Sequence, residues 1–263
     1  GHVSSIYDML LPYYLLKGSP SDDDCGIAET GNGLPDLLDE AQNEVDFWLS
    51  LRDGEGYSHG TTNPDEEGVI YQADATSTAA WANAVNAAMY ASCLKIAGRD
   101  ALCKKYTQAA LEAWDVANRA PQEELGRIQN LGLNSMRGQD FKMTAAAFLW
   151  DLTGEEAYEQ IIEEQAHISR GIAEDSIRDA DQIWATAGYL GSSRHPKREQ
   201  FADRLRKLAI ETGRAQAMDM ALRPSRRSSD RDLGFFHTGQ NVMRIILAHH
   251  LVSPSENILR QDL

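Results

Sequence analysis

Apolar residues recur every three or four positions along most of this chain, and this period constrains its fold more than any other feature. Between Leu34 and Leu51 they follow one face of a helix whose first turn holds Pro35, a residue that suits a helix start. The same period predicts helices over residues 79–97, 101–118, 140–152, 155–169, 182–190, 197–220 and 239–251. The breaks between helices fall at Gly98, Gly154, Gly191 and Pro254. With about eight helices and no alternating strand pattern, we expect an all-α fold.

Tryptophan recurs at positions 48, 81, 114, 150 and 184, a spacing of 33 to 36 residues. The residues around each tryptophan do not repeat in register, which favours a stack of antiparallel helical hairpins over a solenoid with a sequence period. Long polar loops over residues 52–72, 119–139 and 170–181 separate the hairpins. Because loops of this length often carry function, we expect a functional site there.

Charge narrows the classes of partner. The 263 residues carry 25 Lys and Arg against 40 Asp and Glu, a net charge of −15, so neither nucleic acid nor an anionic membrane face is an expected partner. The longest apolar runs, at 9–16 and 245–248, are far shorter than the roughly 20 residues that cross a bilayer. The basic stretch 194–231 is interpreted as a solvated helix face followed by a loop.

The cysteines give no framework for a disulfide scaffold or a zinc site. Cys25, Cys93 and Cys103 have neither a pairable number nor the spacing of metal ligands, so we expect thiols and no metal or other cofactor. No signal peptide is visible at Gly1, which leaves both a cytoplasmic and a secreted location open. Residues 9–16 begin in mid-pattern and 256–263 are still helical in composition. We therefore expect the chain to be part of a longer one.

Four segments have a distinctive composition and order. The first reads GLPDLLDEA at 33–41 and continues through VDFWL at 45–49 to DGEGYSHG at 53–60. ADATSTAAWA follows at 73–82, ALEAWDVA at 110–117 and FLWDLTGE at 148–155. In this order and spacing, the four segments resemble the motifs of glycoside hydrolase family 9. The resemblance covers most of residues 33–190.

The resemblance implies an (α/α)6 toroid, a ring of helical hairpins whose inner helices point loops at a cleft for a β-1,4-linked sugar chain. It further implies that residues 1–263 form a single toroid segment, truncated at both termini. The family's catalytic base, an Asp of an N-terminal motif, is expected before Gly1. Its catalytic acid, a Glu near the C-terminus of the domain, is expected after Leu263. The catalytic residues are therefore expected outside this sequence.

Substrate-binding positions follow from the resemblance one by one. His59 matches a histidine that hydrogen-bonds a sugar hydroxyl, with an exposed loop histidine as the alternative. Asp140 matches an acidic cleft position, with a helix N-cap as the alternative. Asp181 and Trp184 resemble a cleft segment in which an aromatic ring stacks on a pyranose, although core packing would also explain Trp184. His237 resembles a position in a turn before a late inner helix, where a structural role is the alternative.

The resemblance implies a glycoside hydrolase that cleaves β-1,4-linked gluco- or glucosamino-oligosaccharides by an inverting acid/base mechanism. The expected partner is an oligosaccharide substrate, and the acidic balance would suit cationic glucosamine units. Helical toroids host several activities, so two alternatives stay open. One is a non-catalytic glycan-binding toroid, and the other is a toroid enzyme of different chemistry, such as a sugar epimerase.

Overall fold

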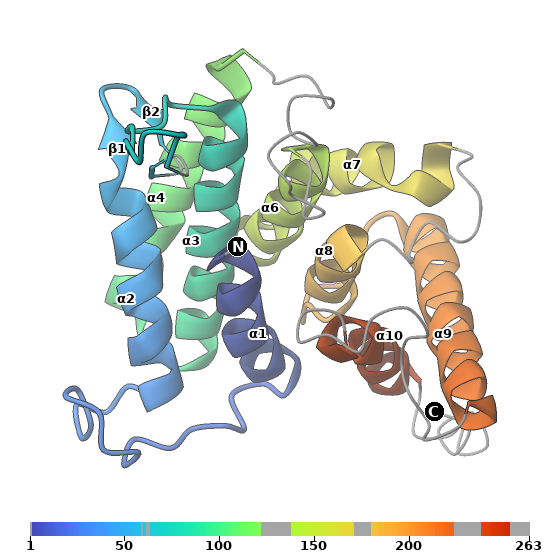
Figure 1. The fold of residues 1–263 in the computed structure, drawn as a ribbon. Coiled ribbons are helices and arrows are strands. Elements are labelled where there is room, and N and C mark those ends of the chain that lie inside the picture. Colours follow the sequence, from blue (N-terminus) through green and yellow to red (C-terminus); the bar gives the residue numbers. More distant parts are fainter. Residues whose placement is uncertain are drawn as a thin grey trace.

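The computed structural model describes residues 2–58, 60–61, 64–121, 138–170, 180–223 and 238–252, which form helices almost throughout (Figure 1). The α-helices are α1 (His2–Leu15), α2 (Asp36–Ser50), α3 (Ser77–Ile96), α4 (Asp100–Arg119), α6 (Gly138–Thr153), α7 (Glu156–Gln165), α8 (Ala180–Leu190), α9 (Glu199–Leu222) and α10 (Thr238–Leu251). A short 3-10 helix, η1 (His167–Arg170), follows α7. The all-α fold class predicted from the sequence is confirmed.

Helices α1, α3, α6 and α8 form an inner layer. Helix α3 is buried along nearly its whole length, and alanines such as Ala80, Ala84 and Ala88 let its neighbours approach closely. A helix that is apolar on all sides must be surrounded by other elements. Accordingly, α3 packs against α1, α2, α4 and α6, and α6 packs in turn against α8 (Figure 1).

Helices α2, α4, α7 and α9 form the outer layer. Each has one buried face and one exposed face, the pattern of a helix that covers a core. Sharp turns connect inner to outer helices: Gly98 links α3 to α4 and Gly154 links α6 to α7, both with positive φ. Glycine adopts this left-handed conformation without steric cost, so a helix can end there. The predicted breaks at these two glycines are confirmed.

The inner helices run in the same direction. Two hydrogen bonds between their C-terminal ends show this. Lys17, just after α1, donates a hydrogen bond from Nζ to the carbonyl of Gly191, just after α8. Lys95, in the last turn of α3, donates from Nζ to the carbonyl of Asp151 near the end of α6, at 3.0 Å. The first turns of α1, α3, α6 and α8 therefore lie toward the opposite end, where Gln182 of α8 bonds Asp140 of α6. We call this end the N-terminal rim.

A basic cluster of Lys17, Lys95 and Arg194 closes the C-terminal end. Arg194 donates from Nε to the carbonyl of Asp151 at 2.6 Å and from Nη2 to the carbonyl of Leu152 at 3.0 Å. Parallel helices bring the negative ends of their dipoles together, and cations at that end offset the repulsion. Burial lowers the pKa of Lys17.

Two local features differ from the sequence prediction. The helix expected over 155–169 ends at Gln165, and η1 follows it after Ala166, which is extended. The loop after α2 contains a short antiparallel hairpin, β1 (Arg52–Asp53) with β2 (Gly56–Tyr57), too short to give an alternating pattern. These are the only named strands in the described residues, so the helical architecture is unaffected.

Gly213 tests the close packing of α9 against α10. A Cβ atom at this position would meet the carbonyl oxygen of Arg244 at 2.5 Å and the side chain of Ala248. Backbone cannot move aside as a flexible side chain can, so Gly213→Ala is expected to lower the free energy of unfolding by about 1–2 kcal/mol, despite the higher helix propensity of alanine. Urea denaturation measures the change. Ala215→Gly, at an exposed position of the same helix, calibrates the propensity term; a more stable Gly213→Ala variant would contradict the packing.

Candidate functional site

The segment between α2 and α3, residues 52–76, lies at the N-terminal rim, where α3 begins (Figure 1). Isolated bridges join Ser58 to Ala75 and Thr61 to Gln72. The Ser58 hydroxyl donates to the carbonyl of Ala73 at 2.6 Å and accepts from the backbone N–H of Gly60 at 3.1 Å. The two sides of this segment are thereby held together. His59, predicted as a sugar contact, lies between these anchored residues but outside the described residues itself.

Asp140 lies in the first turn of α6 and joins a buried network. The Gln182 side chain, at the start of α8, donates from Nε2 to Asp140 Oδ1 at 3.2 Å and to the carbonyl of Gln165 at 3.3 Å. Its Oε1 accepts from the backbone N–H of His167 at 3.1 Å. One amide thus connects the start of α6, the end of α7, η1 and the start of α8, so it fixes how these elements meet at the rim.

The burial of Asp140 bears on its predicted role. The residue is 2% exposed, and its carbonyl accepts a hydrogen bond from the hydroxyl of Thr144 at 2.8 Å. Its carboxylate faces Gln182 across the α6–α8 contact. A direct contact with a ligand would require a rearrangement here, so a contact between Asp140 and sugar stays a prediction.

Trp184 occupies the inner layer. It is 4% exposed, and its ring stacks on Tyr7 of α1 with centroids 4.9 Å apart and an interplanar angle of 30°. This is the packing expected of a core residue. Tyr7 would have to move before a pyranose could stack on the same face, so a contact between Trp184 and sugar also stays a prediction.

The remaining predicted contacts lie at the edge of the described part. Asp181 is in the first turn of α8, next to Gln182, but its side chain is outside the described residues. His237, just before α10, is outside them entirely. Among the described residues, no group of three or more His, Cys, Asp or Glu side chains is placed to hold a metal ion. No helix in the described ranges is long and apolar enough to cross a membrane.

Sequence reasoning missed two side chains at the rim, Gln182 and Lys142. The Nζ atom of Lys142, in α6, lies 5.4 Å from the ring centroid of Trp81 in α3, a cation–π arrangement. Gln182 is 3% exposed despite its polar side chain. A glutamine at the start of an otherwise apolar helix is a weak signal, but it could have identified Gln182 as a buried hydrogen-bonding residue.

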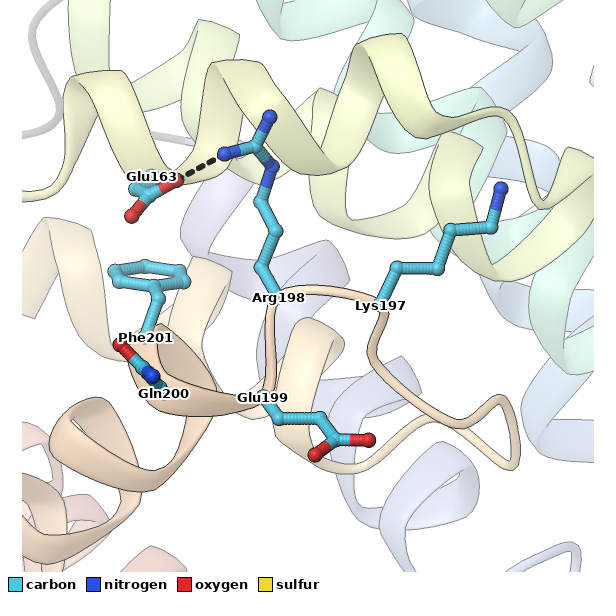
Figure 2. A pocket seen from close by; sticks show the side chains of 6 residues that line it. All are labelled: Glu163, Lys197, Arg198, Glu199, Gln200 and Phe201. Atoms are coloured by element: carbon cyan, nitrogen blue, oxygen red, sulfur yellow. Dashed lines mark hydrogen bonds and ion pairs between the residues drawn. The ribbon is translucent and has the colours of Figure 1, made fainter.

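Two surface pockets are lined by residues outside the hydrogen-bond network of Gln182. Figure 2 shows the first, lined by Glu163, Lys197, Arg198, Glu199, Gln200 and Phe201 between α7 and the start of α9. Arg198 forms an ion pair with Glu163 across it. Beneath it, buried Glu159 accepts from the Tyr189 hydroxyl at 2.7 Å and from the backbone N–H of Arg198 at 3.1 Å. The second pocket belongs to the basic cluster. Each pocket therefore contains a polar contact between two elements: the ion pair of Arg198 with Glu163 in the first and the hydrogen bond from Lys95 to the carbonyl of Asp151 in the second.

Comparison with known proteins identifies the fold. Neither a protein-family profile nor a curated protein sequence matches the chain. Solved structures do. A family 9 glycoside hydrolase (GH9) of Bacteroides ovatus is 20% identical, covers 99% of this chain and 52% of its own, and has a TM-score of 0.70. A metagenome-derived glycoside hydrolase family 9 endoglucanase is 22% identical; the match covers 99% of this chain and 51% of the endoglucanase, with a TM-score of 0.70.

A third solved structure is AaCel9A in complex with a cellobiose-like isofagomine, which is 15% identical. The match covers 99% of this chain and 53% of AaCel9A, with a TM-score of 0.70. These neighbours are (α/α)6 barrels, so the chain has the fold of part of a helical toroid. It spans about half the length of these solved chains. The fold implied by the sequence resemblance is confirmed.

Proposed function

We propose that this chain is part of a family 9 glycoside hydrolase that acts on β-1,4-linked oligosaccharides. The observation that carries the proposal is a coincidence of two independent features. The motifs at 33–60 and 73–82 resemble that family in sequence, and the parallel inner helices bring the segment between them to one rim together with Asp140 and Gln182. One solved protein with the same fold is a family 9 endoglucanase, and another, AaCel9A, was solved in complex with a cellobiose-like isofagomine.

The proposed chemistry is inverting hydrolysis. It needs a carboxylic acid that protonates the leaving oxygen and a carboxylate that activates water on the other face of the sugar, roughly 6.5–9.5 Å apart. In this proposal both groups lie outside residues 1–263, the base before Gly1 and the acid after Leu263. The task of the residues present is to bind and orient the sugar chain. His59, with its flanks anchored by Ser58 and Gly60, would hydrogen-bond a hydroxyl close to the cleaved bond.

Two substrate classes fit the proposal, glucose oligomers and glucosamine oligomers. A glucosamine unit carries an ammonium group that needs a carboxylate nearby, and Asp181 and Asp140 are the candidates. A charge-assisted hydrogen bond of this kind contributes roughly 1.5–3 kcal/mol. Asp181, in the first turn of α8, is the more direct candidate because Asp140 is already bonded to Gln182. The net charge of −15 also favours a cationic substrate.

Binding measurements separate these substrates. By isothermal titration calorimetry with cellotetraose and with the glucosamine tetramer, Asp181→Asn is expected to weaken binding of the glucosamine tetramer about 10-fold while changing cellotetraose binding less than about twofold. Asp140→Asn is the companion variant, and Glu199→Gln, in the first surface pocket, is the control. Equal losses on both tetramers would remove the glucosamine preference. If the unmodified chain binds neither tetramer, the proposed function is overturned.

A further inference from the structure

A short exposed loop at the N-terminal rim presents three consecutive large apolar side chains. Val69, Ile70 and Tyr71 are 43%, 57% and 54% exposed, and they lie in the 52–76 segment beside the bridge between Thr61 and Gln72. Single exposed apolar residues are common on protein surfaces, but adjacent ones that form a patch indicate a surface used for binding.

The loop is closed by one carboxylate, that of Asp65. Its Oδ1 accepts from the backbone N–H groups of Glu67 at 3.0 Å and Val69 at 2.8 Å, and its Oδ2 accepts from the Tyr71 hydroxyl at 3.0 Å. The backbone N–H of Asp65 in turn donates to the carbonyl of Val69 at 3.0 Å. These bonds, led by that from Val69, lower the pKa of Asp65. The loop is therefore closed by its own hydrogen bonds while its three apolar side chains stay about half exposed.

Charge limits what can cover this patch. Asp65, Glu66 and Glu67 give the loop three carboxylates and no cation, so an anionic partner or a second copy of the same loop would be repelled. An uncharged or cationic partner with a flat apolar face fits better. The C–H face of a pyranose ring meets this description, because its hydroxyls point to the sides and leave the faces apolar.

We propose that loop 65–71 is an outer saccharide subsite, in which the Tyr71 ring packs on a pyranose of a long oligosaccharide that extends from the rim. The inference rests on the proposed function and deepens it, since it predicts a preference for longer chains. The bond from the Tyr71 hydroxyl to Asp65 fixes one edge of the ring, and the preceding residue, Ile70, is also largely exposed. A fixed ring loses little freedom on binding, which favours affinity.

The test compares a long with a short oligomer. Calorimetric titration with cellohexaose is expected to show about 10-fold weaker binding for Tyr71→Ala, equivalent to about 1.4 kcal/mol, while cellobiose binding changes less than about twofold. Tyr71→Phe keeps the ring and should bind cellohexaose within about threefold of the unmodified chain. Asp65→Ala opens the loop without touching the ring and should fall between the two. Far-UV circular dichroism checks that each variant is folded.

Phe47→Ala is the matched control, because Phe47 is an equally exposed aromatic residue on outer helix α2. If Tyr71→Ala and Phe47→Ala bind cellohexaose equally well, the subsite is overturned while the proposed function stands. Equal losses on cellobiose and cellohexaose also overturn it, since the ring would then belong to a central site. If the unmodified chain binds neither oligomer, the proposed function fails and the subsite fails with it.

Discussion

Trp81→Ala is expected to lower the free energy of unfolding by about 3–5 kcal/mol, the usual range for removing a buried tryptophan. Trp81 is buried in α3 and meets Trp114 of α4 edge to face, with ring centroids 4.9 Å apart and planes at 82°. Trp114 meets Tyr158 of α7 in the same way at 5.2 Å. Removing the first ring leaves a cavity between α3 and α4 and ends the contact with Trp114. Urea denaturation followed by circular dichroism should therefore show a much lower midpoint.

Two further variants sharpen this prediction. Phe47→Ala removes an exposed aromatic ring and should change the free energy of unfolding by no more than about 0.5 kcal/mol. A double-mutant cycle with Trp114→Ala measures the coupling between the rings, which is expected to be about 0.5–1.5 kcal/mol. A loss below about 1 kcal/mol for Trp81→Ala would show that the inner layer collapses around the missing ring, contrary to the close packing described.

Arg194→Met is expected to lower the free energy of unfolding by about 2–3 kcal/mol, because two hydrogen bonds from a charged group to helix carbonyls are lost. The guanidinium lies across Gly154, where a Cβ atom would meet Nη1 at 2.5 Å, so the contact depends on glycine at that turn. Methionine preserves much of the aliphatic length but none of the donors. Chemical denaturation of both proteins measures the difference.

Lys207→Met is the control for the loss of a charge alone. Lys207 is 77% exposed and pairs only loosely with Glu211 at 3.9 Å within the same helix, so its removal should cost no more than about 0.5 kcal/mol. Arg194→Lys keeps the charge without the planar fork and should be intermediate. If Arg194→Met and Lys207→Met are equally mild, the basic cluster does not hold the inner helices together.

The helices could be predicted because their signals are local. The apolar period between Leu34 and Leu51 and the breaks at Gly98 and Gly154 need only neighbouring residues, and the structure has helix boundaries there. The tryptophan spacing also had a physical basis. Trp81 and Trp114 stand in consecutive helices of one hairpin and touch each other.

The hydrogen bonds at the N-terminal rim and at the C-terminal end of the inner helices could not be predicted, because they join residues far apart in sequence. Gln182 bonds Asp140 from 42 positions away, and Arg194 bonds the carbonyl of Asp151 from 43 positions away. The sequence interpretation of 194–231 as a solvated face was wrong for Arg194, whose guanidinium is engaged with α6. Of the predicted site residues, Asp140 lies in the first turn of α6 and bonds Gln182, whereas Trp184 shows the packing of a core residue.

The parallel inner helices separate two kinds of evolutionary change. Helix α3 has 20 residues and is therefore about 30 Å long, so the basic cluster and the rim lie well beyond the roughly 7–10 Å within which substitutions couple. Changes at the two ends should then add independently. A substitution at the rim that costs stability can be compensated by a favourable one at the C-terminal end without disturbing the rim. Such a fold can vary the residues at its rim while keeping its scaffold.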